Sequence, residues 1–395
     1  MKVCVIGSGG REHALAWRLS ISPSVTKVYA IPGSAAMSDC AELVGIDWQQ
    51  SDHLISFLKD NQVDLVVVGP EAPLVAGLAD VLNKAGIPVF GPSKAAAQLE
   101  GSKVFAKDLM KKYNIPTAAY GVFHKVDEAK AFIAQTGAPI VVKADGLAAG
   151  KGVVVAIVIE EFMEGEEASL LAFVDGKTVV PMIASQDHKR IFDGDKGPNT
   201  GGMGTYAPAP VLTDALRDAA MKTILEPMVA AMEKEGMPYV GCLYAGLMIT
   251  DEGPKVVEFN ARFGDPETQV VLPLLDSDLG EIMMACAKGT LTSNMVKWKD
   301  SSAACVILAS KGYPETSSKG DVISGDIKQY DTTIVFHSGT KLVGENYVTN
   351  GGRVLGVVGL GKDLRTALDR AYERIEHIDF EGMQYRTDIG AKAFK

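Results

Sequence analysis

The sequence predicts a protein of α/β and α+β domains: an N-terminal Rossmann-like open parallel sheet, a central domain of paired strands and a C-terminal mixed α/β domain. In the first hundred residues, short apolar runs alternate with amphipathic helical segments, which is typical of a parallel sheet covered on both faces. From residue 101 the strands are longer and joined by tight turns, and a third set of strands begins near residue 298. We therefore expect domains over residues 1–100, 101–297 and 298–395.

The N-terminal domain should contain four strands, because four apolar runs are bounded by polar or turn-forming residues, at 3–6, 28–30, 65–68 and 89–90. The intervening segments with the spacing of amphipathic helices are 10–19, 54–59 and 74–84. Ligands of open α/β sheets bind beyond the carboxyl ends of the strands. The turns that follow the first and third strands are therefore candidate binding sites.

The central domain should hold strands at 139–143, 153–160, 170–174, 178–183, 240–249 and 255–259, and helices at 104–113 and 213–235. Between them lies a Gly-, Pro- and Asn-rich segment, 194–210, of a length that usually signals function or disorder. The C-terminal domain should comprise strands at 304–309, 333–336 and 353–359 and a helix at 363–376.

Composition argues against two classes of protein. The 395 residues carry a net charge of -10, whereas a protein that binds nucleic acid or a membrane surface without sequence specificity needs a basic face. No apolar run approaches the ~18–20 residues of a membrane span, and no secretory signal precedes the first strand. The five cysteines form no CxxC pair, which indicates free or buried thiols in a reducing compartment. We expect a cytoplasmic protein.

Two turns of the N-terminal domain could bind ligands. The first consists of four small residues between a strand and a helix: Gly7, Ser8, Gly9 and Gly10. Its backbone N–H groups could hold a phosphate, but Glu12 occupies the third glycine position of a dinucleotide fingerprint, so we expect a phosphate site without NAD. In the second turn, Glu71 could accept hydrogen bonds from a sugar hydroxyl or an amine. The alternatives are a tight turn without a ligand and a solvated glutamate.

The segment KADGLAAGKG, over residues 143–152, indicates a second phosphate site. A strand delivers Lys143, and glycines that surround Lys151 would let the backbone approach phosphate oxygens. The segment is not a Walker A loop, because no G-x-x-x-x-G-K-[ST] occurs in the chain. The alternative is a flexible surface loop.

The pair Glu258 and Asn260 is the strongest candidate for metal chemistry. Residues two apart on a strand face the same side, while Val257 and Phe259 would face the core. Such hard oxygen ligands suit Mg²⁺ that bridges nucleotide phosphates. Arg262 would lie on the same face if the strand continues, close to a transferring phosphate. The alternative is a polar face of an edge strand.

Two further polar segments follow apolar strands, 187–190 and 199–204. The first contains His188, and a single histidine of this kind is more often structural than catalytic. The second is a glycine-rich loop of hydrogen-bond donors.

Six motifs occur in series: GSGGREHAL, GPEAPL, GLAAGKGV, EEFMEGEEAS, NTGGMG and EFNARFGDPETQ. In this order they closely resemble the phosphoribosylamine–glycine ligase family of the ATP-grasp superfamily, over almost the whole chain. The resemblance implies a central ATP-grasp domain that uses ATP to activate glycine as glycyl phosphate. The amine of 5-phosphoribosylamine would then displace phosphate and give glycinamide ribonucleotide, ADP and phosphate, in purine biosynthesis.

The resemblance also implies roles for individual residues. The ATP-binding residues would be Lys103, Lys143, Gly150, Lys151, Gly152, Glu160, Glu161, Phe162, Met163 and Glu166. Glu258 and Asn260 would bind Mg²⁺ or Mn²⁺, and Arg262 and Lys143 would stabilise the transferring phosphoryl group. The substrates would contact Gly7, Ser8, Gly9, Gly10, Glu71, Asp187, Lys189, Asn199, Thr200, Gly201, Gly202, Met203, Arg262, Gly264, Asp265, Pro266 and Glu267.

The chain departs from the family at one point. Family members usually carry a helix and an extended loop before the hinge strand, whereas here Ala156 leads directly into Ile157. Two antiparallel strands cannot be joined there without a turn. We expect that a lid segment is missing at 156/157, either from the printed sequence or from the protein itself.

Three other functions are compatible with parts of the sequence. A biotin carboxylase or a formate-dependent transformylase would share the positions of Lys143 and Glu258 but not the motifs GPEAPL and NTGGMG. An NAD-dependent oxidoreductase would require a third glycine where Glu12 stands. A nucleotide-binding regulator without activity would not need Lys143, Glu258, Asn260 and Arg262 together. We expect a monomer with small-molecule substrates, and possible transient contact with the enzyme that supplies phosphoribosylamine.

Overall fold

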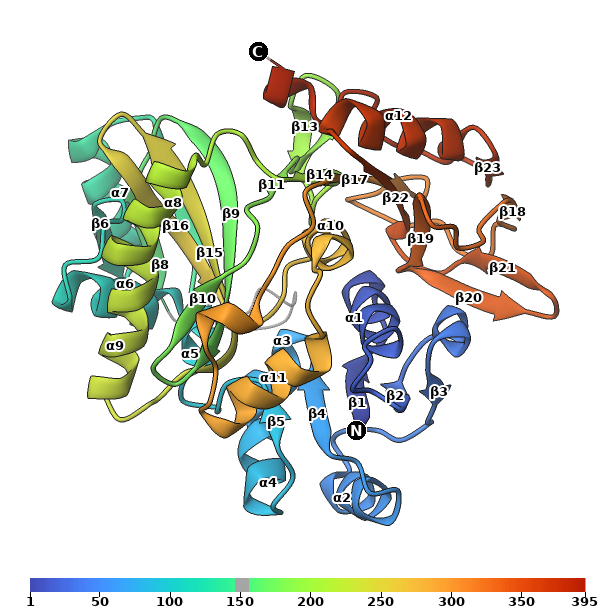
Figure 1. Cartoon of the computed structure of the whole chain (residues 1–395). Helices are drawn as coiled ribbons and strands as arrows, with labels where there is room; N and C mark the ends of the chain where they lie inside the picture. The colour runs from blue at the N-terminus through green and yellow to red at the C-terminus, as the bar shows by residue number, and fades with distance from the viewer. Residues whose placement is uncertain (146–155, 395) are drawn as a thin grey trace.

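The computed structural model describes residues 1–145 and 156–394 (Figure 1). The N-terminal sheet consists of parallel strands in the order β3-β2-β1-β4-β5. Its elements are β1 (Lys2–Gly7), α1 (Gly10–Ser20), β2 (Lys27–Pro32), β3 (Glu42–Leu43), α2 (Ser51–Asp60), β4 (Leu65–Val68), α3 (Glu71–Ala76), α4 (Leu78–Lys84) and β5 (Val89–Phe90). The predicted parallel sheet is thus confirmed. Strand β3 was not predicted, and the predicted helix at 74–84 is two helices, because the chain turns at Gly77 with a φ of 97°.

The order of these strands places the two N-terminal turns side by side. Strand β1 lies between β2 and β4: the chain adds β2 and β3 on one side of β1 and then crosses to the other side with β4. The turns after β1 and β4 therefore flank one crevice at the carboxyl edge of the sheet, the usual ligand position in open α/β sheets. These are the turns that contain Gly9 and Glu71.

The central part consists of two antiparallel sheets, β6-β8-β7 and β10-β9-β15-β16. Its strands are β6 (Tyr120–Phe123), β7 (Ile140–Ala144), β8 (Ile157–Glu161), β9 (Glu166–Asp175), β10 (Val179–Pro181), β15 (Val240–Thr250) and β16 (Gly253–Asn260). Its helices are α5 (Gln98–Gly101), α6 (Lys103–Lys112), α7 (Val126–Thr136), α8 (Asp214–Ala220), the π-helix η2 (Met221–Leu225) and α9 (Glu226–Lys234). This is the ATP-grasp arrangement, and in Figure 1 it forms the left half of the molecule.

A bulge at Val257 changes one detail of the predicted strand β16. The register shifts between Gly246 and Leu247, which pair with Glu258 and Val256. Val256 is consequently buried in the core, whereas Val257 lines a cavity. The prediction that Val257 faces the core is wrong, because an alternation counted from sequence cannot anticipate an extra residue within the strand itself.

The C-terminal sheet has the order β11-β14-β17-β22-β19 and is covered by α12 (Leu364–Ile375). Its strands are β11 (Gln186–Asp187), β14 (Gly204–Ala207), β17 (Ser302–Ala309), β19 (Thr333–His337) and β22 (Arg353–Gly361). Two of these strands come from the segment before residue 210, which therefore crosses between the central and C-terminal parts. The domain boundaries at 100 and 297 stay predictions.

Several smaller elements complete the described chain. A hairpin of β12 (Arg190–Phe192) and β13 (Lys196–Asn199) lies between β11 and β14. The others are η1 (Ala35–Asp39), α10 (Thr268–Val271), η3 (Leu272–Leu274), α11 (Leu279–Lys288), η4 (Ser293–Met295), β18 (Ser324–Gly325), β20 (Thr340–Val343), β21 (Asn346–Thr349), β23 (Ile378–Asp379) and η5 (Ala391–Phe394).

Apolar packing joins the three parts. Phe90 of β5, Phe173 of β9 and Phe263 lie with ring centroids 6.1 to 6.3 Å apart, in one buried cluster that extends from the N-terminal sheet to the C-terminal strands. The cysteines are free, as expected. In the described part of the chain, none of the helices combines the length and the hydropathy that a membrane crossing requires.

Candidate functional site

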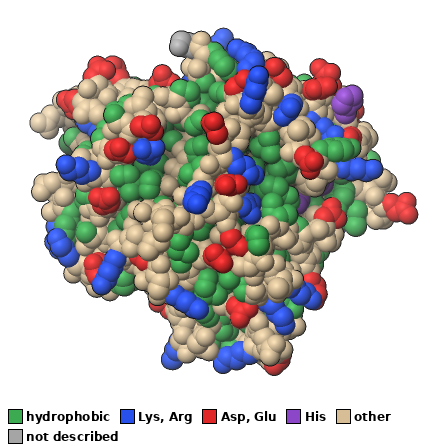
Figure 2. Space-filling model, in the orientation of Figure 1, with side chains coloured by type: hydrophobic (Ala, Val, Ile, Leu, Met, Phe, Trp, Pro, Cys, Tyr) green, Lys and Arg blue, Asp and Glu red, His purple; other side chains and the backbone are tan. Residues whose placement is uncertain are grey.

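A cavity of about 600 Å³ lies between α6, the hinge strand β8 and the end of β16. Its lining residues are Leu99, Glu100, Lys103, Ala106, Lys107, Met110, Lys143, Glu160, Val257, Glu258, Phe259 and Asn260. Segments more than 150 residues apart therefore contribute cations, carboxylates and an amide to one space. On the face shown in Figure 2, basic and acidic side chains lie next to one another near the centre, between apolar side chains.

Glu160 holds two lysines at one end of this cavity. Its Oε2 atom lies 3.1 Å from Nζ of Lys143 and 3.1 Å from Nζ of Lys107. Lys143 also donates to the carbonyl oxygen of Val257 at 3.2 Å, and Lys107 donates to Thr117 Oγ1 at 2.8 Å. Glu160 is 3% exposed, and its Oε1 atom is buried without a hydrogen-bond partner. A buried acceptor of this kind suits a ligand that brings a donor.

Glu258 and Asn260 lie on the wall of the same cavity, at the end of β16. In the described part of the chain, no group of three or more His, Cys, Asp or Glu side chains is arranged so that it could hold a metal ion. One carboxylate and one amide oxygen instead fit Mg²⁺-type binding, in which waters and nucleotide oxygens complete the coordination. The donor set therefore fits a divalent metal that arrives with a nucleotide.

Arg262 follows β16 and is held by two carboxylates. Its Nη2 atom lies 2.8 Å from Glu100 Oε1, and its Nε atom lies 3.7 Å from Glu71 Oε2. Burial alone would lower the pKa of Arg262, but these carboxylates outweigh it and raise that pKa. Burial raises the pKa of Glu100, which Arg262 opposes. The guanidinium is thus fixed as a cation between the N-terminal turn and the cavity.

A second, smaller cavity of about 340 Å³ begins at Glu258 and leads toward β11. Its lining residues are Glu167, Ala168, Ser169, Asp187, Lys189, Tyr244, Gly246, Val257 and Glu258. Asp187 Oδ2 pairs with Lys189 at 3.0 Å, whereas Asp187 Oδ1 is buried without a hydrogen-bond partner. Glu267 accepts from Tyr244 at 3.1 Å, and burial followed by repulsion from Asp187 raises its pKa. Two buried carboxylates thus lie close to one lysine, and an additional cation would be stabilised here.

The N-terminal turn borders a third cavity of about 990 Å³, whose lining includes Gly7, Ser8, Gly9 and Trp48. Glu12 accepts from the backbone N–H of Gly9 at 2.7 Å. A Cβ atom at Gly7 would come within 2.4 Å of the Glu12 side chain, so this turn requires glycine. Glu12 therefore caps α1 from the position where a dinucleotide fingerprint has its third glycine.

Among the other predicted residues, Lys103 lines the first cavity. Glu161 ends β8, Phe162 and Met163 follow that strand, and Glu166 begins β9; these four are not among the residues that line the three cavities. Gly202 contacts Asp187 and Pro266, because a Cβ atom there would lie 2.6 Å from Pro266 and 2.8 Å from Asp187. Asn199 is exposed at the end of β13, whereas Met203 is buried. Gly150, Lys151 and Gly152 lie outside the described residues.

Sequence reasoning missed four polar residues of the site: Glu100, Lys107, Tyr244 and Arg353. Arg353 Nη1 donates to the carbonyl oxygens of Gly201 and Asp265, each at 2.7 Å, and its Nη2 lies 3.3 Å from Asp265 Oδ2. No motif surrounds these residues. Two charged residues four apart on one helix, Lys103 and Lys107, were a signal that could have identified Lys107.

Comparison with known proteins gives a consistent result. Family models described as phosphoribosylglycinamide synthetase match the N domain at residues 1–100, the ATP-grasp (A) domain at 101–157 and 155–268, and the C domain at 303–392. A phosphoribosylamine–glycine ligase of Halalkalibacterium halodurans is 50% identical over 418 aligned positions, which cover 100% of this chain and 97% of the relative. The Rhizobium meliloti ligase is 48% identical, over 100% and 99%.

Solved structures agree with these matches. The crystal structure of a phosphoribosylamine–glycine ligase from Thermotoga maritima is 33% identical, with a TM-score of 0.86 over 99% of this chain and 100% of that one. The biotin carboxylase domain of a Hydrogenobacter thermophilus 2-oxoglutarate carboxylase is 16% identical, with a TM-score of 0.72 over 97% and 91%. The second likeness concerns the fold alone.

The comparisons also bear on residues 156 and 157. The match to the ATP-grasp family model is divided into two segments that meet at residues 155–157, and the Halalkalibacterium alignment is longer than the 395 residues of this chain. In the structure the described chain resumes at Ala156, whose carbonyl oxygen accepts from Asp145 N at 3.0 Å, and Ile157 begins β8. Whether a lid segment is missing at 156/157 stays a prediction.

Proposed function

Because the chain belongs to the phosphoribosylglycinamide synthetase family, we propose that it joins glycine to 5-phosphoribosylamine with ATP and forms glycinamide ribonucleotide, ADP and phosphate. This is a step of purine biosynthesis, and it makes the chain an ATP-grasp carboxylate–amine ligase. The observation that carries the proposal is the cavity in which Lys143, Glu160, Glu258 and Asn260 meet, within a chain that is 50% identical to named ligases over its whole length.

ATP would lie in the first cavity, with its adenine toward β8 and its phosphates toward β16. Lys143 and Lys103 would neutralise phosphate oxygens, and the buried Oε1 of Glu160 would accept a hydrogen bond from the base. The segment from Glu161 to Met163 would bind adenine through its backbone, and Glu166 would bind the ribose. Gly150, Lys151 and Gly152 would contact the phosphates.

Glu258 and Asn260 would hold the divalent metal that the family uses, Mg²⁺ or Mn²⁺. When bound, the metal would neutralise charge on the nucleotide phosphates. Arg262, whose guanidinium Glu100 holds, would stabilise the phosphoryl group as it passes to the glycine carboxylate. Phosphoryl transfer depends on such positioning more than on protein nucleophiles.

Glycine would occupy the second cavity, which is lined by Glu258, Asp187 and Tyr244. Glu267 lies behind this lining and accepts a hydrogen bond from Tyr244. The carboxylate of glycine would point toward the nucleotide, and its ammonium group would lie between the carboxylates of Asp187 and Glu267. A cation at this position would pair with the buried Oδ1 atom of Asp187 and relieve its repulsion with Glu267. The walls at Gly246 and Tyr244 would leave little room for a longer amino acid.

Phosphoribosylamine would approach from the N-terminal side. The turn from Gly7 to Gly10 would contact its phosphate or ribose through backbone N–H groups, and Glu71 would accept from its hydroxyl or amine. The segment from Asn199 to Met203 and the segment from Gly264 to Glu267 would enclose it on the other side. Arg353, which donates to both segments, would hold them together.

We further propose that the protein acts in the cytoplasm as a monomer, with transient contact to the enzyme that supplies its unstable amine substrate. Buried or half-buried free cysteines support a reducing compartment. If the protein itself lacks a lid segment at 156/157, close in sequence to Glu160 of the first cavity, ATP binding would be weaker and water would reach the acyl phosphate.

The test is release of ADP with each substrate omitted in turn. The proposal requires that ADP release depends on glycine and that glycinamide ribonucleotide forms only when phosphoribosylamine is present. ADP release that depends on bicarbonate or formate instead would assign the chain to another ATP-grasp reaction.

A further inference from the structure

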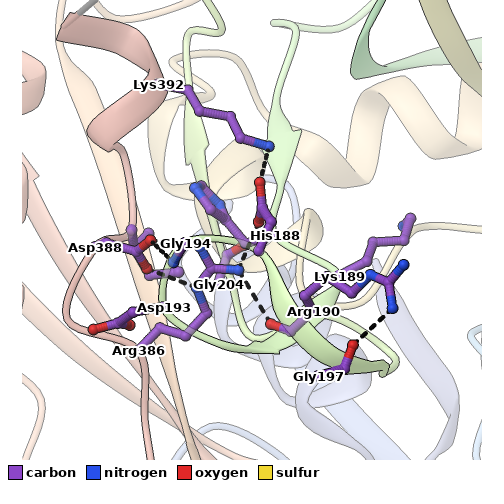
Figure 3. A network of polar contacts seen from close by, with 12 residues as sticks. His188, Lys189, Arg190, Asp193, Gly194, Gly197, Gly204, Arg386, Asp388 and Lys392 are labelled. Atoms are coloured by element: carbon purple, nitrogen blue, oxygen red, sulfur yellow. Dashed lines mark hydrogen bonds and ion pairs between the residues drawn. The ribbon is translucent and has the colours of Figure 1, made fainter. Parts of the chain in front are cut away.

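The segment at the C-terminal end of the described chain binds the hairpin β12–β13, which lies between two strands of the candidate substrate site (Figure 3). Arg386 is central to this contact and is 1% exposed. Its guanidinium donates to Asp195 Oδ1 at 2.8 Å and to the carbonyl oxygen of Arg190 at 3.1 Å. It also donates to both carboxylate oxygens of Asp388, each at 2.7 Å.

The contacts concentrate on the turn of the hairpin. Gly194 N donates to Asp388 Oδ2 at 2.8 Å, and Lys392 Nζ lies 2.7 Å from Asp195 Oδ2. Thr387 N donates to Asp193 Oδ1 at 2.9 Å. Every residue of the turn, 193–195, is therefore bound to the C-terminal segment. In Figure 3, Lys392 and Arg386 point into this turn from different sides.

A second contact reaches the base of the hairpin. Gly390 N donates to His188 Nε2 at 3.4 Å, and His188 Nδ1 lies 3.3 Å from the carbonyl oxygen of Gly204. Burial, followed by the charges of Arg386 and Lys392, lowers the pKa of His188 to about 4, so the ring is neutral near pH 7. A neutral ring that accepts at Nε2 must donate at Nδ1, which agrees with both contacts.

His188 lies between the two charged residues of the second cavity, Asp187 and Lys189. The backbone here is fixed on both sides: Met203 N donates to His188 O at 2.8 Å, and Thr200 N donates to Lys189 O at 2.7 Å. Movement of the hairpin or of the His188 ring would therefore displace both charged side chains. Neither Arg386 nor Lys392 lines any of the three cavities.

We propose that Arg386 is a positioning residue: the C-terminal segment, through Arg386, holds the hairpin β12–β13 and thereby places Asp187 and Lys189 for binding of the amino acid. This inference rests on the proposed function for the identity of that amino acid. The geometric part, that Arg386 restrains residues 188–204, does not depend on it.

The chain offers a matched control in Arg374. This arginine is 8% exposed, forms an ion pair with Asp326 and donates to Lys328 O at 2.8 Å. It belongs to the same C-terminal part and has the same kinds of partner, but the segment it binds contains no candidate site residue. A structural role alone would make R386A and R374A equivalent.

The experiment compares R386A, R386K and R374A by hydrogen exchange and by kinetics. We expect faster exchange of the amides at 188–204 in R386A and not in R374A. We also expect the glycine KM of R386A to rise about tenfold or more while its ATP KM stays within about twofold, with R386K between R386A and the wild type. If R386A does not fold, D195N replaces it, because this variant removes only the negative charge of one of the acceptors that bind Arg386.

Unchanged exchange at 188–204 in R386A would overturn the inference, as would an equal rise of the glycine KM in R374A. ADP release by the wild type that does not depend on glycine would instead contradict the proposed function. The hydrogen-exchange comparison alone would then decide the role of Arg386. The two failures are therefore distinguishable.

Discussion

Lys143 Nζ lies 3.1 Å from Glu160 Oε2, although the two residues belong to different strands, β7 and β8. The strands are antiparallel neighbours, and Lys143 pairs with Val158, two residues before Glu160. Both side chains therefore project from the same face of the sheet. Lys107 reaches the same carboxylate oxygen from α6, so Glu160 fixes the position of two cations at one end of the proposed ATP site.

Replacement of Lys143 by Met should raise the ATP KM about tenfold to a hundredfold, because a cation beside the phosphates is lost. The fold should persist, since Glu160 keeps its ion pair with Lys107. Initial rates over a range of ATP concentrations measure the effect. K107M is the comparison: it removes the bond to Thr117 and should lower the thermal midpoint more than K143M. An unchanged ATP KM in K143M would place the phosphates elsewhere.

Replacement of Glu258 by Ala should abolish ATP turnover and leave the thermal midpoint nearly unchanged. Glu258 is exposed at the end of β16, and its proposed role is to bind a metal rather than to pack. Turnover measured against Mg²⁺ concentration, together with a melting curve, tests both parts. Near-normal turnover of E258A at saturating Mg²⁺ would refute the metal role.

Replacement of Arg262 by Lys should lower kcat by about tenfold or more, because a point charge cannot reproduce a planar fork that also contacts Glu100. The pair matters as well: E100Q should lower kcat in the same direction, since the guanidinium then loses the negative charge of its partner at 2.8 Å. Single-turnover formation of ADP in the presence of glycine is the measurement. If R262K matches the wild type, the planar fork of Arg262 is not required for phosphoryl transfer.

Replacement of Asp187 by Asn should raise the glycine KM by about tenfold to a hundredfold and change the ATP KM little. The wild-type site should reject glycolate, which lacks an ammonium group and would leave the carboxylates of Asp187 and Glu267 unpaired. D187N should discriminate less between the two acids. The ratio of kcat/KM for glycine to kcat/KM for glycolate measures this discrimination. An equal ratio in the wild type and in D187N would show that Asp187 does not bind the ammonium group.

Acid should destabilise the protein below about pH 6.5 through its buried histidines. Burial lowers the pKa of His13 to about 3, with repulsion from His337 as the second cause, and burial lowers the pKa of His188 and of His337 to about 4. In the unfolded chain these histidines therefore become protonated near pH 6.5, whereas in the folded chain they become protonated only at about pH 4 or below. The free energy of unfolding falls as pH falls across this window, by about 1.4 kcal/mol per pH unit for each histidine.

Urea unfolding at several pH values tests this sign. In H13N, the amide oxygen of asparagine replaces His13 Nδ1 as acceptor of the backbone N–H of His337. The slope of the free energy of unfolding against pH should then fall by about one proton between pH 4.5 and 6. A slope as steep as that of the wild type would exclude His13 as a contributor.

The sequence predicted the order of the elements well where strands are wholly apolar. Residues 65–68 and 89–90 coincide with β4 and β5, because strands buried on both faces form uninterrupted apolar runs. It failed where a single residue or a distant partner decides the outcome. Gly77 divides one helix into two, and β11 and β14 join a sheet whose other strands come from residues beyond 300.

The candidate site was predictable where motifs continue along the chain, as around Glu258. Glu100 and Arg353 were not predictable, because their partners are brought to them only by packing between elements far apart in sequence. Arg386 belongs to the same class. Its partners Asp195 and Arg190 O lie almost two hundred residues earlier, and nothing in the local sequence distinguishes this arginine from a solvated one.

The most direct test of the account is the stoichiometry of one reaction mixture that contains ATP, Mg²⁺, glycine and freshly prepared phosphoribosylamine. We expect one ADP and one phosphate for each glycinamide ribonucleotide, and no ribonucleotide product when glycine is omitted. ADP release at the same rate without glycine would contradict the account, because the two carboxylate-lined cavities would then not serve to bring an amino acid to ATP.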